Sequence, residues 1–322
     1  MRPRLSTALL ALLAASALAA GASAQSRPLV IAALKGPSGI GLVKLFEKPP
    51  VLPDAGTVSP IAVGSADLMA AKVISGEYDM AVLPVNMAAK LYSSGIGIRL
   101  VAVIGNGMVS FLTSDPSINS LADLRGKEIA VAGQGATPDY LFRRLLKGAG
   151  LDPDRDLRLS YALPYPEAAM ALAAGKISCA VLPEPFASLA LASKPDLRPA
   201  LDLGRLWTQA TGEASYPMTA LVASSTLAAQ RPDAVGALLA ACSSSIDWVK
   251  ANPKDAGALV EKLDLGLKAG IAEKAIPRSN YTYLSALQAR AGIEALLATF
   301  LEMAPASIGG KLPDAAFYAS FK

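Results

Sequence analysis

Two glycine-containing turns are the first candidates for contacting a ligand. Each follows an apolar stretch and precedes a helical pattern, so each joins a strand to a helix. Glycine lets the backbone approach a ligand closely, and the N–H groups of a helix start attract polar or anionic groups. Gly and Ser are also ordinary caps at such positions, which leaves a purely structural role open. The candidate residues in these turns are Pro37, Ser38, Gly39, Gln134, Gly135, Ala136 and Thr137.

Three further side chains could supply polar or aromatic contacts. Asn86 follows a proline that ends an apolar strand, and its amide can both donate and accept hydrogen bonds. Glu184 lies between two prolines and can accept hydrogen bonds from an amine or a hydroxyl, or it is simply a solvated loop carboxylate. Tyr216 precedes Pro217, where its ring can cover a ligand or pack in the core.

The residue types that are missing exclude several kinds of chemistry. The chain has no histidine, so Ser-His-Asp and Cys-His catalytic arrangements and imidazole metal sites cannot form. Neither glycine turn has the G-x-G-x-x-G spacing of a dinucleotide site or the Gly-Lys-Ser/Thr of a phosphate loop. We therefore expect a binding site without a catalytic residue, a metal or a cofactor.

Alternating strand and helix patterns must position these loops. Short apolar runs at 29–34, 58–63 and 81–83 predict strands separated by helical segments, and runs at 128–132, 157–161 and 177–182 repeat this arrangement. Such alternation predicts an α/β fold with parallel sheets covered by helices. Ligands bind outside the carboxyl ends of the strands in these sheets, which is where the candidate loops fall.

A weak internal repeat indicates two related units. The segment from Gly76 to Pro84 resembles the segment from Gly175 to Pro183, and both contain Ala-Val-Leu-Pro after an Ala-rich helical stretch. The alternative is that βα units look alike by composition. The shared phase favours two related lobes. Beyond residue 217, long Ala/Leu-rich patterns, including one over 283–303, predict helices that return to cover the first lobe.

Composition and charge favour a folded, two-lobed protein that does not bind nucleic acid. The chain has 322 residues, which fits two domains of ~150 residues each. Hydrophobic residues make up 52% and charged residues 17%, enough apolar material for a large core. There is no dense Lys/Arg stripe with interleaved aromatic residues. We expect a monomer.

The first 24 residues resemble a secretory signal peptide. Arg2 and Arg4 precede an apolar run over 9–20, and Ala22-Ser23-Ala24 offers small residues before a cleavage site, with Gln25 as the first mature residue. A membrane anchor is the alternative, but the run is shorter than the ~20 residues that span a bilayer. No cysteine follows it, so we expect an exported protein that is not a lipoprotein. Cleavage leaves a net charge near +2, because the segment carries two of the 30 basic and none of the 26 acidic residues.

The two cysteines, Cys179 and Cys242, lie in apolar and helix-like stretches. A disulfide is chemically possible after export, but we expect two buried free thiols.

Taken together, these segments resemble a known family. The signal-like start, the 34–41 turn, the two Ala-Val-Leu-Pro segments, Leu121-Ala-Asp-Leu-Arg-Gly-Lys127 and residues 133–139 are similar to periplasmic substrate-binding proteins of nitrate/sulfonate/taurine-type (NitT/TauT) ABC importers, a group that includes SsuA/THI5-like proteins. The resemblance covers nearly the whole mature chain. The Asp-Leu-Arg-Gly-Lys segment alone is common among binding proteins.

The resemblance implies a type II periplasmic binding fold. Lobe 1 would contain residues 25–113 and 216–322, lobe 2 would contain residues 114–215, and crossings near 110–113 and 216–220 would form a two-segment hinge. The expected partners are a small-molecule ligand and an ABC-type membrane permease with its ATPase. The two glycine turns and the loops that contain Asn86 and Glu184 show no cluster of Arg or Lys, and only Lys35 lies near them. We therefore expect a polar or mono-anionic organic ligand rather than a doubly charged anion.

Two other functions stay open. An enzyme on the same fold, a lyase or a pyrimidine synthase, is disfavoured by the missing histidine and by the absence of paired carboxylates in the candidate loops. A ligand-sensing accessory protein for a membrane receptor would use the same closing movement as a transporter component.

Overall fold

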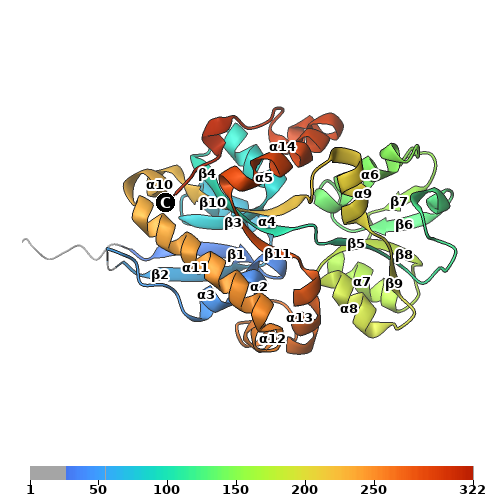
Figure 1. Ribbon diagram of the computed structural model, residues 1–322, viewed down its shortest axis with the longest axis horizontal. Coiled ribbons are helices and arrows are strands. Elements are labelled where there is room, and N and C mark those ends of the chain that lie inside the picture. Colours follow the sequence, from blue (N-terminus) through green and yellow to red (C-terminus); the bar gives the residue numbers. More distant parts are fainter. Residues whose placement is uncertain (1–26, 55, 322) are drawn as a thin grey trace, which may run out of the picture.

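Two α/β lobes lie side by side in the computed structural model, which describes residues 27–54 and 56–321 (Figure 1). The predicted signal peptide lies outside these residues. We call the larger sheet and its helices lobe 1, and the smaller sheet and its helices lobe 2. Both are of the predicted α/β class.

The sheet of lobe 1 has six strands in the order β11-β4-β10-β3-β1-β2. Strand β1 pairs in parallel with β2 and β3, and β10 pairs antiparallel with both β3 and β4. The central strands are almost fully buried, as their continuous apolar sequences predict. The strand bounds are β1 Leu29–Leu34, β2 Val58–Val63, β3 Met80–Pro84, β4 Ile98–Asn106, β10 Pro217–Ser224 and β11 Tyr281–Ser285.

The sheet of lobe 2 has five strands in the order β7-β6-β8-β5-β9. Strand β6 pairs in parallel with β7 and β8, and β5 pairs antiparallel with β8 and β9. The strand bounds are β5 Val109–Thr113, β6 Glu128–Val131, β7 Arg158–Ser160, β8 Cys179–Pro183 and β9 Arg198–Leu201.

The strand arrangement supports the predicted internal repeat. In each sheet, one strand of the repeat (β3 or β8) lies between a parallel neighbour (β1 or β6) and an antiparallel one (β10 or β5). Each repeat strand follows a helix and precedes another, α4 and α5 in lobe 1, α7 and α8 in lobe 2. The two lobes therefore share the arrangement around the repeat strands, and residues at the ends of these strands can be compared directly.

Helices cover the sheets and supply the core (Figure 1). The long helix α11 packs on α3 and β11, and α14 packs on β4 and α5, so the C-terminal helices cover lobe 1 as predicted. The α-helix bounds are α2 Pro37–Gly41, α3 Val43–Glu47, α4 Ala66–Ile74, α5 Val85–Ser93, α6 Thr137–Gly148, α7 Tyr165–Ala173, α8 Phe186–Ser193, α9 Leu203–Thr211, α10 Ser225–Gln230, α11 Pro232–Ala251, α12 Pro253–Lys262, α13 Ala269–Ala275 and α14 Ala286–Met303. Short 3-10 helices include Leu121–Leu124, Ile276–Arg278, Pro305–Ile308 and Ala315–Phe317.

The first crossing between the sheets comes earlier in the chain than the predicted boundary at residue 113. Strand β4 ends at Asn106 and β5 begins at Val109 in the other sheet, so residues 109–113 lie in lobe 2 and not in lobe 1. The return crossing lies between α9 and β10, and the predicted boundary between residues 215 and 216 falls within it. Gly107, with a φ of 55°, follows the last residue of β4, within the Gly105-Asn106-Gly107 segment that separates the apolar runs at 99–104 and 109–112.

One predicted helix begins too early. Residues 281–285 form strand β11, which pairs antiparallel with β4, rather than the start of a helix at residue 283. Helix α14 begins at Ala286 instead. Ser285 is its N-cap residue, and the side chains of Ser285 and Gln288 form a reciprocal capping box. Aromatic and β-branched residues before this cap fit a strand.

Both cysteines, Cys179 and Cys242, are buried and free, as predicted. Across the part of the chain that the structure describes, no helix is both long enough and apolar enough to cross a membrane.

Candidate functional site

The carboxyl ends of β1, β3 and β4 and the amino ends of the antiparallel strands β10 and β11 form one edge of lobe 1. The register pairs Thr219 of β10 with Pro84 on one side and with Gly105 on the other, and Gly105 also pairs with Tyr281. Extending the β1–β3 register places Lys35 opposite Pro84. We call this row and the loops that leave it the lobe 1 edge. It brings the loop after β1 close to the loop after β3, as the sequence predicts.

The first glycine turn is held by hydrogen bonds between the Ser38 side chain and the Leu34 backbone. The Ser38 hydroxyl accepts a hydrogen bond from the Leu34 N–H at 3.1 Å and donates one to the Leu34 carbonyl at 3.2 Å. A Cβ at Gly39 would lie 2.8 Å from the same carbonyl oxygen. Pro37 starts the five-residue helix α2, which has no side-chain cap. Ser38 therefore stabilises the turn. It does not serve as the helix cap, the role that the sequence left open for it.

Three side-chain oxygens of the lobe 1 edge, those of Asn86, Asn106 and the Tyr281 hydroxyl, are buried without a hydrogen-bond partner among the described residues. Among the described residues, neither the Asn86 Oδ1 nor the Asn106 Oδ1 has a hydrogen-bond partner. Asn86 lies in the first turn of α5 after β3, and Asn106 is the last residue of β4. Burying such a group without a partner costs about 1–3 kcal/mol, so each requires an explanation. A ligand that donates hydrogen bonds to these oxygens would explain why they are buried without a partner in the protein.

Sequence reasoning found Asn86 but missed Asn106 and Tyr281. The position of Asn106 at a strand end was a usable signal, because β4 runs parallel to β3 and ends at the same edge. The position of Tyr281 at this edge follows only from the pairing of β11 with β4. It is 3% exposed, and burial raises the pKa of its hydroxyl, which therefore stays neutral.

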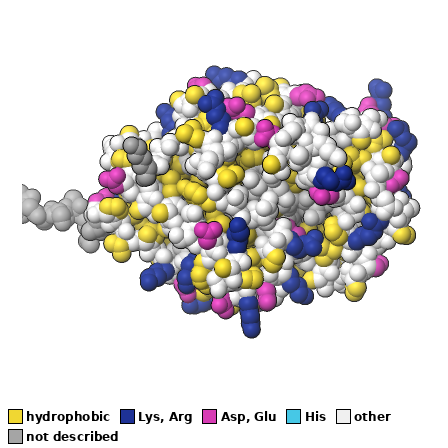
Figure 2. All heavy atoms as spheres, in the orientation of Figure 1, with side chains coloured by type: hydrophobic (Ala, Val, Ile, Leu, Met, Phe, Trp, Pro, Cys, Tyr) yellow, Lys and Arg dark blue, Asp and Glu magenta, His cyan; other side chains and the backbone are white. Residues whose placement is uncertain are grey.

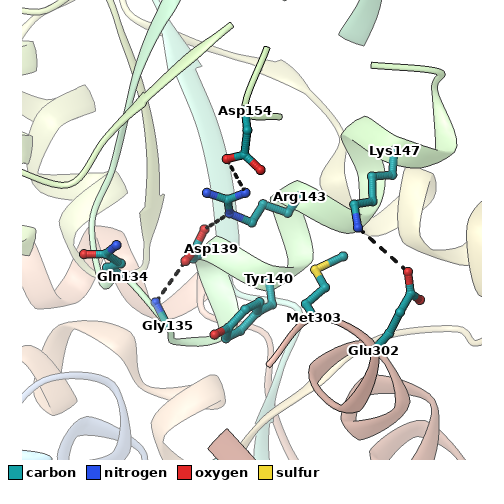
Figure 3. A pocket seen from close by; sticks show the side chains of 9 residues that line it. All are labelled: Gln134, Gly135, Asp139, Tyr140, Arg143, Lys147, Asp154, Glu302 and Met303. Atoms are coloured by element: carbon teal, nitrogen blue, oxygen red, sulfur yellow. Dashed lines mark hydrogen bonds and ion pairs between the residues drawn. The ribbon is translucent and has the colours of Figure 1, made fainter. Parts of the chain in front are cut away.

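In lobe 2, Asp139 fixes the second glycine turn (Figure 3). Its carboxylate is 5% exposed and accepts hydrogen bonds from the Gly135 N–H at 2.9 Å, the Arg143 Nε at 2.9 Å and the Tyr161 hydroxyl at 2.7 Å. Burial and the hydrogen bond to Asp139 raise the pKa of Tyr161. This network orients the start of α6, where Ala136 is the N-cap residue and Thr137 is buried.

A pocket of about 540 Å³ lies beside this turn (Figure 3). Gln134 and Gly135 line it from lobe 2, and Glu302 and Met303 line it from the end of α14 in lobe 1. Tyr140, another lining residue, packs on Phe300 of α14 with ring centroids 4.6 Å apart. Two of the four predicted residues of the second turn, Gln134 and Gly135, thus face a pocket at the boundary between the lobes.

Glu184 joins the two lobes. Its side chain is 1% exposed, and its two oxygens accept hydrogen bonds from the Ser188 N–H at 3.1 Å and from the Arg278 Nε at 3.0 Å. Arg278 belongs to lobe 1, between α13 and β11. The carboxylate is therefore occupied by protein groups in this structure. The Ser188 hydroxyl beside it is buried and has no partner among the described residues.

Tyr216 lies at the crossing between the lobes. It is fully buried, its carbonyl accepts a hydrogen bond from the Gly107 N–H at 3.0 Å, and its hydroxyl accepts one from the Val109 N–H at 3.3 Å. Its ring also meets Trp207 edge to face at 5.8 Å. These contacts tie the two crossing segments together, so Tyr216 packs in the core here and does not form an open lid.

The cations at the lobe 1 edge are paired. The Lys35 Nζ lies 2.5 Å from an Asp264 carboxylate oxygen, and Arg278 is bound to Glu184 as described. On the visible face, acidic and basic side chains are interspersed rather than gathered into a basic stripe (Figure 2). This distribution gives no support to nucleic-acid binding.

Comparisons with known proteins agree with this architecture. Residues 26–263 match the model of the NMT1-like family. An ABC transporter from Parabacteroides distasonis is 32% identical, with a TM-score of 0.79 over 91% of this chain and 98% of that chain. Comparison with curated protein sequences gives no match.

More distant structures share the fold. The periplasmic aliphatic sulphonate binding protein SsuA from Escherichia coli is 19% identical, with a TM-score of 0.70 over 92% of this chain and 94% of that chain. The periplasmic nitrate-binding protein NrtA from Synechocystis is 14% identical, with a TM-score of 0.62 over 86% and 81%. The chain belongs to the NMT1-like family, and its fold is that of NitT/TauT-type substrate-binding proteins of ABC importers.

Proposed function

We propose that this protein is an extracytoplasmic solute-binding protein that captures a small organic molecule between its lobes and delivers it to an ABC importer. The observation that carries the proposal is the pair of buried, unpartnered oxygens of Asn86 and Asn106, at an edge next to both crossings. The P. distasonis relative, an ABC transporter structure, supports the importer assignment.

The proposed binding region combines the sequence candidates with the residues that the structure adds. Lobe 1 contributes its edge, and lobe 2 contributes the glycine turn before α6 together with Ser188. Glu184 and Tyr216 act indirectly, the first by joining the lobes and the second by fixing the crossings. The proposed binding residues are Pro37, Ser38, Gly39, Asn86, Asn106, Gln134, Gly135, Ala136, Thr137 and Ser188.

The lobes would move about residues 106–109 and 212–217. Closure is favoured when a ligand contacts both lobes and so binds the closed state more tightly than the open one. We further propose that the protein is exported by its cleaved signal peptide, works as a monomer with a permease and its ATPase, and releases its ligand chemically unchanged. N-terminal sequencing of the exported protein should begin at Gln25.

Thermal-shift screening of the purified protein against small organic solutes tests the proposal. A ligand at 100 times its dissociation constant adds about 2.7 kcal/mol to stability, which is readily detected. Mass spectrometry of the released ligand should return the molecule that was added, and a strain lacking the protein should lose its uptake. Conversion of the ligand into a product would contradict the proposal.

A further inference from the structure

The lobe 1 edge offers hydrogen-bond acceptors about two strand spacings apart. Asn86 leaves the edge after β3 and Asn106 ends β4, with β10 between these strands. Neighbouring strands lie about 4.8 Å apart, so the two strand ends are separated by roughly 10 Å, the span of a small organic molecule. The unpartnered atoms of Asn86 and Asn106 are carbonyl oxygens, which accept hydrogen bonds and cannot donate them, whereas the Tyr281 hydroxyl, also unpartnered among the described residues, can accept or donate.

The same edge shows no surplus of positive charge. Lys35 is paired with Asp264, and the charge of Arg278 is balanced by the buried carboxylate of Glu184. An anion placed beside Asn86 and Asn106 would face acceptor oxygens and would gain no net attraction from these balanced pairs. A neutral molecule avoids this penalty and can satisfy the oxygens directly.

We propose that the ligand is an uncharged molecule whose N–H or O–H groups donate to the Asn86 and Asn106 oxygens. This inference rests on the proposed solute-binding function and narrows the expected polar or mono-anionic ligand to a neutral donor. It distinguishes this chain from the sulphonate-binding and nitrate-binding proteins that share its fold.

Matched pairs of probes separate charge from shape. Thermal-shift and calorimetric titrations would compare benzamide with benzoate, nicotinamide with nicotinate, and methanesulfonamide with methanesulfonate, with nitrate added as a small anion. The neutral member of a pair should bind at least tenfold more tightly than its anion. Its affinity should change less than about twofold between 20 and 500 mM salt, because a neutral ligand has no charge to screen.

Substitutions at the two asparagines test the assigned role. Asn86→Leu and Asn106→Leu should each weaken binding of the preferred neutral probe about tenfold or more, because a donor of the ligand loses its partner. Asn86→Asp keeps an acceptor at the same place and should retain binding within about fivefold. For an anionic ligand the same Asp variant would abolish binding, so the Leu and Asp variants together distinguish the two cases.

The outcomes separate the inference from the function on which it rests. Tighter binding of benzoate, nicotinate, methanesulfonate or nitrate would overturn the neutral-ligand inference and leave the solute-binding function standing. Unchanged binding in both Leu variants would overturn the assignment of these residues. Binding of no probe from either set at millimolar concentration would count against both the inference and the proposed function.

Discussion

The two loops that follow the repeated Ala-Val-Leu-Pro strands have diverged in what their polar side chains do. In lobe 1, Asn86 keeps a buried oxygen that has no partner in the part of the chain that the structure describes. In lobe 2, both oxygens of Glu184 are bound, one by Ser188 within the lobe and one by Arg278 of the other lobe. The strand before each loop has the same arrangement, with a parallel neighbour on one side and an antiparallel one on the other, so the two loops occupy matching positions. One copy is free to meet a ligand, and the other holds the lobes together.

Replacing Glu184 should have the largest effect on stability. Glu184→Ala removes a buried carboxylate and leaves the Ser188 N–H and Arg278 without their partner. Because Arg278 is partly exposed, we expect a loss of about 2–3 kcal/mol in the free energy of unfolding, measured by urea denaturation. Glu184→Gln, which keeps hydrogen-bond acceptance, should lose less. A change below about 0.5 kcal/mol in the Ala variant would show that the loop does not join the lobes.

A substitution at the first crossing should have the next largest effect. Gly107 has a φ of 55°, and a Cβ there would lie 2.7 Å from the Ser215 hydroxyl. Gly107→Ala should therefore cost about 1–2 kcal/mol, read from the same denaturation curves. Gly64, which has open space around its Cα and an ordinary φ, provides the matched control. Equal effects of Gly64→Ala and Gly107→Ala would argue against a constrained crossing.

The turn before α6 should be less sensitive. Asp139→Asn keeps the shape of the side chain but weakens its bonds to the Gly135 N–H and Arg143, for an expected loss of about 1 kcal/mol. Asp154, 71% exposed, pairs with the same arginine from the solvent side. Its Asn variant should change stability by less than about 0.5 kcal/mol. A reversed order would mean that Asp139 does not hold the turn.

Asn86→Ala should have the smallest effect on the stability of the unliganded protein. Its side-chain oxygen has no partner to lose, so the change should stay within about 0.5 kcal/mol, while ligand affinity falls about tenfold. Thermal denaturation with and without a bound probe measures both. A large loss of unliganded stability would assign Asn86 a structural role and would remove the contrast with Glu184.

The sequence predicts features that depend on local pattern. The strand at 29–34, the repeat strands and the long C-terminal helices follow from apolar periodicity, and the family resemblance supplied the two-lobed fold. The predicted strand ends then locate the candidate loops, including the one that contains Asn86.

Features that depend on contacts between residues far apart in the sequence could not be predicted from local patterns. Glu184 and Arg278 are separated by 94 positions, so their ion pair leaves no trace in local sequence. Strand β11 depends on pairing with β4, and without that pairing Tyr283 reads as part of the following helix. The Gly105-Asn106-Gly107 segment indicates a break between two apolar runs, but that the runs belong to different sheets depends on long-range strand pairing.

Hydrogen–deuterium exchange with the tightest-binding probe tests the central claim most directly. If the lobes close on a ligand at the lobe 1 edge, amides at 84–88 and 105–109 in lobe 1 and at 133–138 in lobe 2 should gain protection together in the bound protein. Protection confined to one lobe, or to segments away from both turns, would contradict the account.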